Sequence, residues 1–170
     1  MAEHTNRERL QPSLLDRLTD DAPDKTTESR DQRVLSLQRL RASVLRDLGW
    51  LLNTVNLSAV NDLSDYPELA NSVLNYGVPD LAGHTASSVD VFALERLLKE
   101  SIVRFEPRLV NRKLKVKLDV TNPIDHNTMV FIINCDLWAQ PVALNMDLKT
   151  EVDLELGHVE VSVRAARANR

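Results

Sequence analysis

The sequence predicts an α+β domain, with N-terminal helices packed on one face of a small antiparallel sheet. Two observations predict it. Up to about residue 105, apolar residues recur at three- and four-residue steps, which is the spacing of helices with one buried side. After that point they alternate with polar residues in four short segments, which is the spacing of strands with one face in water. Helices followed by a four-strand meander are typical of this class.

The composition fits one folded domain with a polar arm. At 170 residues and 43% hydrophobic content, the chain can bury a substantial core. A net charge of −4 and 4% aromatic residues argue against a nucleic-acid partner. With one cysteine and four scattered histidines, we expect no disulfide framework, no metal site and no cofactor. No apolar run approaches the ~18 residues of a membrane span, and the N-terminus lacks a signal-peptide core, so we expect a cytoplasmic protein without direct membrane insertion.

Residues 1–29 are predicted to form a flexible N-terminal arm, because they are polar, charged and rich in loop-forming residues. Within this arm, Ser13 can cap a short amphipathic docking turn. The apolar residues of the turn are Leu14, Leu15 and Leu18. Such a turn either docks on a partner or folds back on its own domain, and the sequence leaves both readings open.

A first long helix is predicted over residues 30–53 from the spacing of its apolar residues. Gly49 inside this pattern costs about 1 kcal/mol relative to Ala and is compatible with a kink or a closely packed backbone. Trp50 is expected in the core. A short helix over residues 67–75 is expected to close at Gly77 in a left-handed conformation.

A second long helix is predicted from the helical spacing of Val91, Leu94, Leu98, Ile102 and Phe105. Ser87 or Ser88 is its expected N-cap. Glu95 and Lys99 are expected to form an ion pair one turn apart on the water-facing side.

Four strands are expected over residues 112–121, 129–137, 144–156 and 159–163. The first carries alternating lysines, which we interpret as a solvated face in preference to a phosphate-binding track. Helices and strands together form a single domain over residues 30–164, followed by a basic C-terminal tail at 165–170.

A stiff elbow, Glu106-Pro107-Arg108, separates the helices from the strands. Pro107 cannot continue a helix and disfavours α geometry at the residue before it. In an extended segment Glu106 and Arg108 point to opposite sides, so we expect each to need its own partner instead of neutralising the other. These charges either lock the last helix onto the sheet or dock a partner.

Enzyme signatures are missing from the sequence: there is no glycine-rich phosphate loop and no Gly-x-Ser-x-Gly motif. Glycoside hydrolysis needs two carboxylates held about 5 to 9.5 Å apart. Glu106 is a candidate acid, but no second carboxylate is evident. We therefore expect no catalytic residue and no enzyme activity.

Several motifs in a fixed order carry a family resemblance: PSLLDRL at 12–18, DLGWLLNT at 47–54, YPEL at 66–69, SVLNYGVPD at 72–80 and FEPRL at 105–109. Together they resemble the TssE family of type VI secretion baseplate subunits, relatives of a phage baseplate wedge protein often labelled lysozyme-like. The resemblance covers nearly the whole folded chain. The family's Glu-Pro-Arg falls on Glu106, Pro107 and Arg108, whereas Gly49 stands where Glu is common.

The resemblance implies a structural part of a contractile injection machine. Its partners would be the wedge proteins TssF and TssG, with TssK as a further candidate, and the sheath proteins TssB and TssC. The subunit would sit in the cytoplasm, in a baseplate at the inner face of the inner membrane, and start sheath assembly. The alternative is a peptidoglycan hydrolase with Glu106 as its acid, which the absence of an export signal disfavours.

We expect the last strand to be an open sheet edge that receives a sheath strand, because lysines protect the first strand and nothing comparable protects the last. Strand order and hydrogen-bonding phase cannot be derived from the sequence. The expected partner-binding residues are Glu106, Pro107, Arg108, Leu14, Leu15, Leu18, Val159 and Val161.

Overall fold

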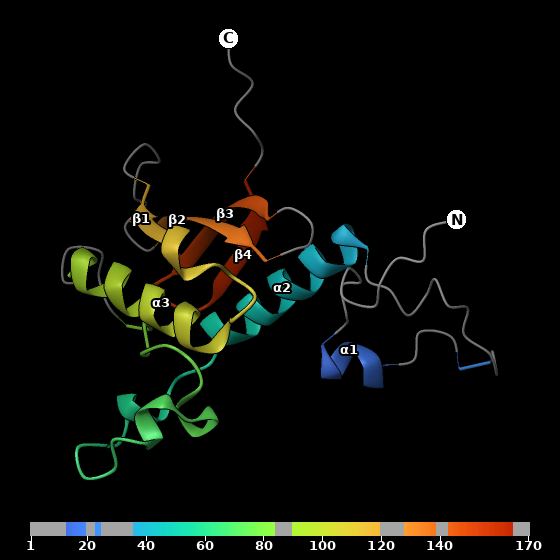
Figure 1. The fold of residues 1–170 in the computed structure, drawn as a ribbon. Coiled ribbons are helices and arrows are strands. Elements are labelled where there is room, and N and C mark those ends of the chain that lie inside the picture. Colours follow the sequence, from blue (N-terminus) through green and yellow to red (C-terminus); the bar gives the residue numbers. More distant parts are fainter. Residues whose placement is uncertain are drawn as a thin grey trace, which may run out of the picture.

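Two long helices lie against one face of a four-stranded antiparallel sheet in a computed structural model of the chain (Figure 1). The structure describes residues 13–19, 23–24, 36–83, 90–119, 128–138 and 143–164. The arm before residue 13, Ser87, Ser88 and the expected basic tail at 165–170 lie outside these described residues.

The elements follow the predicted order of helices first and strands after. They are α1 (Leu14–Leu18), α2 (Leu37–Leu52), α3 (Val91–Phe105), β1 (Lys115–Leu118), β2 (Thr128–Leu137), β3 (Leu144–Asp153) and β4 (Val159–Val163). The strands pair antiparallel in the order β1-β2-β3-β4, which is a meander. The predicted α+β class is therefore confirmed.

One core lies between the inner face of the sheet and the buried sides of α2 and α3. Alternate residues of β2 point into it, and each is at most 1% exposed: Met129, Phe131, Ile133, Cys135 and Leu137. The helices contribute apolar stripes that include Leu40, Val44, Leu48, Leu94, Leu98 and Ile102. β2 is paired on both sides, so it is a central strand of the sheet, as its apolar sequence predicted.

α2 begins at Leu37, later than the apolar pattern suggested. Ser36 has an extended backbone, and its side chain accepts a hydrogen bond from the Arg39 N–H at 3.2 Å, so Ser36 is the N-cap. The expectation that Trp50 packs in the core is wrong, because Trp50 is 49% exposed. Two residues after the buried Leu48, it lies about 200° around the helix from that side chain.

Residues 55–76 project from the helices and sheet as a lobe, drawn in green in Figure 1. The helix predicted over 67–75 is instead two short 3₁₀ turns, η3 (Leu69–Asn71) and η4 (Val73–Asn75). Ser72 between them is extended, and its hydroxyl accepts from the Leu74 N–H at 3.2 Å, so it ends one turn and caps the next.

The positive φ predicted at Gly77 is confirmed, with a value of 124°. A Cβ there would lie 2.2 Å from the Thr54 carbonyl oxygen, so a side chain cannot be accommodated without moving the backbone. Gly49, in contrast, has no heavy atom within 4 Å of a Cβ placed on it. No neighbouring backbone therefore requires glycine at position 49.

α3 differs from its prediction at two points. Its N-cap is Asp90, whose side chain accepts from the Ala93 N–H at 3.1 Å. The expected Glu95–Lys99 pair is wrong, because Glu95 is only 9% exposed and faces β1. Glu95 directly follows the buried Leu94, so it lies on the flank of α3 that meets the sheet and not on the water-facing side.

The strand ends also differ from the sequence pattern. Residues 111–113 form the 3₁₀ turn η5 (Asn111–Lys113), so β1 is shorter than the expected strand 112–121. The lysine side chains are largely exposed, as expected, and two of them also form ion pairs: Lys117 of β1 contacts Glu95 at 2.7 Å, and Lys113 of η5 contacts the buried Asp136. β3 ends at Asp153 instead of residue 156, because the Asp153 carboxylate accepts from two N–H groups of the following turn.

No helix in the described ranges combines the length and the apolar character needed to cross a bilayer. Nor do any three His, Cys, Asp or Glu side chains of those ranges converge in the way that metal ligands do.

Candidate functional site

The Glu106-Pro107-Arg108 elbow is a tight turn. Glu106 is the C-cap of α3, with its N–H bonded to the Ile102 carbonyl at 2.8 Å, and the Leu109 N–H returns to the Glu106 carbonyl at 3.2 Å. The expectation that Glu106 and Arg108 need separate partners is therefore wrong. The turn brings both side chains to one side, where Arg108 Nε donates to Glu106 Oε1 at 2.7 Å and Nη2 donates to Oε2.

Arg108 also connects the elbow to α2. Its Nη2 donates to the Asp47 carboxylate, and its Nη1 donates to Ser43 Oγ at 3.3 Å. Glu106 is 3% exposed, so the three charges form a largely buried network between two elements far apart in sequence. Burial alone lowers the pKa of Arg108, but the hydrogen bonds and charges of Glu106 and Asp47 outweigh it and raise that pKa. The guanidinium stays charged and holds the elbow against α2.

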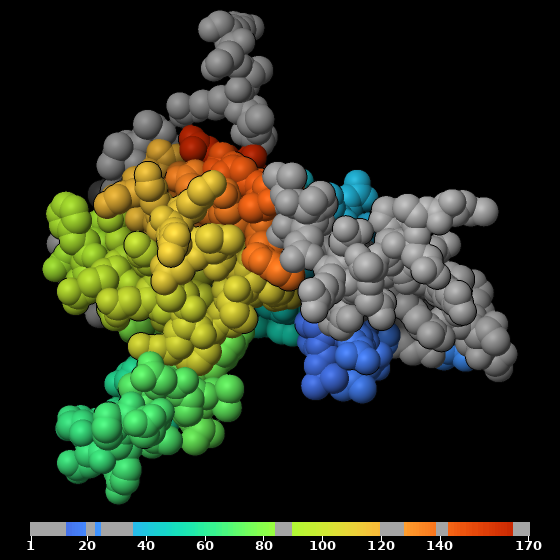
Figure 2. Space-filling view, in the orientation of Figure 1, coloured from blue at the N-terminus to red at the C-terminus, as the bar shows by residue number. Residues whose placement is uncertain are grey.

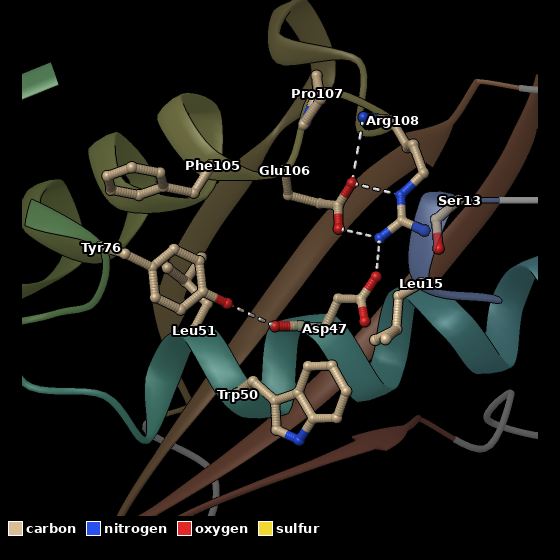
Figure 3. A pocket seen from close by; sticks show the side chains of 10 residues that line it. All are labelled: Ser13, Leu15, Asp47, Trp50, Leu51, Tyr76, Phe105, Glu106, Pro107 and Arg108. Atoms are coloured by element: carbon tan, nitrogen blue, oxygen red, sulfur yellow. Dashed lines mark hydrogen bonds and ion pairs between the residues drawn. The ribbon is translucent and has the colours of Figure 1, made fainter. Parts of the chain in front are cut away.

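Beside this network lies an open groove of about 440 Å³ (Figure 3). It is lined by Ser13, Leu15, Asp47, Trp50, Leu51, Tyr76, Phe105, Glu106, Pro107 and Arg108. Tyr76 and Phe105 form one apolar wall, with their rings edge to face at a centroid separation of 5.3 Å. Burial, together with the charges of Asp47 and Glu106, raises the pKa of Tyr76, so its hydroxyl stays protonated and donates to the Asp47 carbonyl.

The short helix α1 reaches the same groove. Asp16 pairs with Arg46 of α2 at 2.7 Å, and the Arg46 guanidinium lies over the Trp50 ring, 4.9 Å from its centroid. Burial alone raises the pKa of Asp16, but hydrogen bonds from Ser13 and Arg46 outweigh it and lower that pKa. Leu15 lines the groove. The structure thus brings together two regions, the arm and the elbow, that the sequence analysis treated separately.

The exposure of the arm leucines shows how weakly α1 is held. Leu14 is 71% exposed, Leu18 is 74% exposed, and α1 has no buried residue. Its one ion pair to α2, between partly exposed side chains, contributes at most about 1 kcal/mol. An apolar ridge is therefore presented next to the elbow on a segment that is easily moved.

Three residues of this site were missed from the sequence: Asp47, Arg46 and Ser43, all on α2. Asp47 carried a usable signal, because it is the single acidic residue in a helix that has three arginines. Ser43 carried no such signal, because a serine between apolar residues does not indicate which side chain it will contact.

The chemistry of the elbow is that of a structural ion-pair network. Both carboxylates, Glu106 and Asp47, accept from the same guanidinium, and both Glu106 oxygens are engaged by Arg108. A glycosidase needs one carboxyl group free to protonate the leaving group and a second one across a substrate-sized gap. This arrangement is built to join α2 to the elbow.

The outer edge of β4 is a second notable feature. The Asp153 N–H bonds to the His158 carbonyl at 2.8 Å, and the Arg164 N–H bonds to the Asp147 carbonyl at 2.9 Å. Even-numbered residues of this strand therefore bond to β3, and odd-numbered residues direct their backbone groups outward. At Val159 the side chain of Asn53 takes both outward groups, donating to the carbonyl at 2.7 Å and accepting from the N–H at 2.9 Å.

At each edge of the sheet a side chain binds outward backbone groups at one position, and other outward groups of the described strands stay open. In the part of the chain that the structure describes, the outward N–H and C=O groups of Val161 and Val163 make no hydrogen bond. On β1, the outward N–H of Leu118 donates to Glu95 at 2.8 Å and α3 lies alongside, whereas the outward groups of Val116 make no hydrogen bond within the described residues. The expected open edge at the last strand is thus located at Val161 and Val163, whereas the position of Val159 is occupied.

Residues 38–142 match the family model of the baseplate wedge protein gp25. The matched region spans most of α2, the lobe, α3, the elbow, β1 and β2. No curated protein and no solved structure shows significant similarity to the chain.

Proposed function

Because this chain belongs to the family of the baseplate wedge protein gp25, we propose that it is a structural subunit of a type VI secretion baseplate that docks in the wedge and initiates sheath assembly. Membership of the family makes it a component of a phage-tail-like baseplate. The observation that carries the finer proposal is the open edge of β4 at Val161 and Val163.

Sheath initiation needs a template that accepts identical subunits. Strand addition to a sheet edge supplies backbone hydrogen bonds for affinity and alternating side-chain pockets for specificity. β4 offers this edge, since Asn53 ends the pairing at Val159 and leaves the next outward positions unpaired. An added strand from the sheath proteins TssB and TssC would therefore pair beside Val161 and Val163.

Wedge docking is assigned to the groove at the elbow. Pro107 is exposed there and Trp50 is half exposed, and α1, whose Leu15 lines the groove, also exposes Leu14 and Leu18. An apolar groove rimmed by a fixed charge network suits a helix from a partner of the wedge, for which TssF, TssG and TssK are the candidates. In this role Glu106 and Arg108 shape the surface that Pro107 presents, and the baseplate would assemble at the inner face of the inner membrane.

Co-purification tests the proposal directly. The full chain is mixed with TssF and TssG, and separately with the sheath pair TssB and TssC, and complexes are measured by size-exclusion chromatography. We expect the double variant Leu14→Ser/Leu18→Ser to bind TssF and TssG less than the wild type does. Those wedges that still assemble should initiate sheaths normally. The matched control is Val60→Ser, another exposed apolar residue, which lies in the lobe. Capture of neither set of proteins by the folded wild type would refute the proposal.

The hydrolase alternative has its own test. We expect purified wild-type protein and Glu106→Gln to release soluble fragments from peptidoglycan at the same background rate, because Glu106 is bound by Arg108 and lacks a free partner carboxylate. Turnover by the wild type that is lost in Glu106→Gln would favour the hydrolase.

A further inference from the structure

The outer face of α3 carries a second groove, whose lining residues are all different from those of the elbow groove. Its volume is about 550 Å³, and it is lined by Asn71, Arg96, Lys99, Glu100, Val103, Arg104 and Asn111. In Figure 2, α3 and the lobe lie next to each other on the visible face, with α3 in yellow-green and the lobe in green. The groove is therefore formed by one face of α3 together with Asn71 of η3 and Asn111 of η5.

This groove is basic in an acidic protein. Residues 91–119 carry eight Arg and Lys against four Asp and Glu, whereas the whole chain carries 21 against 25. Two of those four acids are buried: Glu106 is bound to Arg108, and Glu95 is bound to Lys117. Each of these two acids is bound by one cation of the same segment, so six cations against two acids remain and the segment keeps its positive excess.

The cations of the groove are available for a ligand. Arg96 makes a loose contact of 3.8 Å with Glu100, and both side chains are more than half exposed. Lys99 has no ion-pair partner within the described ranges. Arg104 is fixed by one hydrogen bond of 2.7 Å from its Nη1 to the Ala70 carbonyl, which also holds the lobe wall in position.

The remaining residues favour a polypeptide over a nucleic acid. Asn71 and Asn111 can donate to and accept from a peptide backbone, and Glu100 adds an acceptor for a peptide N–H. Phe92 lies one turn before Arg96 on the same helix face and is 80% exposed, and Val103 continues that line. A segment of Glu or Asp residues that also carries an apolar side chain complements this row.

We propose that the outer face of α3, from Phe92 to Arg104, binds an acidic segment with one apolar residue from a protein partner, at a site separate from the elbow groove and the β4 edge. Opposite charge steers the encounter, and Phe92 supplies an apolar contact that distinguishes the partner from a simple polyanion. The proposal stands independently of sheath initiation.

The test uses the full chain and a fluorescein-labelled peptide of glutamates and glycines with one central leucine. About eight residues suffice, because α3 rises 1.5 Å per residue and an extended chain spans about 3.3 Å per residue. In anisotropy titrations we expect saturable binding that weakens with salt. Arg96→Glu/Lys99→Glu should weaken it by at least about tenfold, because like charges then face each other.

Matched controls separate the groove from overall charge. Arg17→Glu/Arg39→Glu changes the net charge equally at exposed positions and should leave peptide binding unchanged. Phe92→Ser should weaken binding of the leucine peptide but not of a leucine-free version. No saturable binding, equal losses in both double variants, or tighter binding of a single-stranded oligonucleotide of the same charge would each overturn the proposal. Circular dichroism of each variant establishes that it is folded.

Discussion

Asn53, the residue that ends α2, occupies the sheet edge at Val159 in the way that a neighbouring strand would. Its side-chain amide donates to the Val159 carbonyl at 2.7 Å and accepts from the Val159 N–H at 2.9 Å. An asparagine side chain has the donor and the acceptor needed for both bonds. This pair closes β4 at one end, and it therefore decides which residues remain open to an incoming strand.

The first prediction concerns this pair. Asn53→Asp keeps the shape but cannot donate to the Val159 carbonyl, so we expect a loss of about 1 kcal/mol in unfolding free energy. Asn53→Ala removes the oxygen that accepts from the Val159 N–H, so in this variant the Val159 amide should exchange with deuterium faster than in the wild type. The control for Asn53→Asp is Asn61→Asp, the same substitution at an exposed loop position of the lobe. Unchanged exchange at Val159 in Asn53→Ala would show that Asn53 does not protect the edge.

The second prediction uses the hydrogen-bonding phase of β4. Val161→Pro removes an outward N–H and leaves the ladder to β3 intact, whereas Ser162→Pro removes a donor that faces β3. We expect Val161→Pro to keep its thermal midpoint close to that of the wild type and to lose sheath initiation. Ser162→Pro should lower the midpoint. If Val161→Pro is folded and initiates sheaths at the wild-type rate, the β4 edge is not the docking strand.

The third prediction concerns the elbow network. Arg108→Ala leaves the carboxylates of Glu106 and Asp47 without their shared partner, so we expect a loss of about 3 kcal/mol in urea unfolding. Arg108→Lys keeps the charge but not the forked geometry and should recover only part of this loss. Arg39→Ala, an exposed arginine on α2, should change stability by less than about 0.5 kcal/mol. If Arg108→Ala and Arg108→Lys are as stable as Arg39→Ala, Arg108 does not stabilise the fold.

The fourth prediction is a pH dependence at Glu95. Burial alone raises its pKa, but hydrogen bonds from Lys117 and the Leu118 N–H outweigh it and lower that pKa below 4.5. A carboxyl group with a lowered folded pKa adds stability above its unfolded pKa and loses it as the pH falls through the folded value. Glu95→Gln should therefore cost about 1 kcal/mol at pH 7, and the difference from the wild type should vanish in acid.

Unfolding measured at pH 7 and at pH 3 checks this behaviour. Glu100→Gln is the control, because that carboxylate is exposed and makes only a 3.8 Å contact with Arg96. A difference between wild type and Glu95→Gln that stays constant across this range would show that the charge of Glu95 is not the cause.

The fifth prediction concerns the arm. Deletion of residues 1–20 removes α1, which has no buried residue and one ion pair to α2, so we expect the unfolding free energy to change by no more than about 1 kcal/mol. Wedge capture should fall, because Leu14 and Leu18 are removed. A clear drop in thermal midpoint would show that α1 belongs to the core of its own domain.

The sequence by itself determined the class and order of the elements. Apolar spacing located α2, α3 and β2, because burial of one side of a helix or strand leaves a periodic trace in the chain. Proline at position 107 marked the change from helix to strand, and the positive φ of Gly77 followed from its place after a turn. These are local properties, so local residues carry them.

Tertiary structure decided what each charge touches. Glu95 was expected to pair with Lys99 one turn away but bonds to β1, and Glu106 was expected to diverge from Arg108 but binds it. Both outcomes depend on the direction in which a side chain leaves its backbone once the neighbouring element is in place. The partners of Arg108 and Val159 lie 61 and 106 residues away along the chain, at Asp47 and Asn53, and a local pattern cannot encode such contacts. The edge that stays open was therefore decided by packing of α2 and α3 against the sheet.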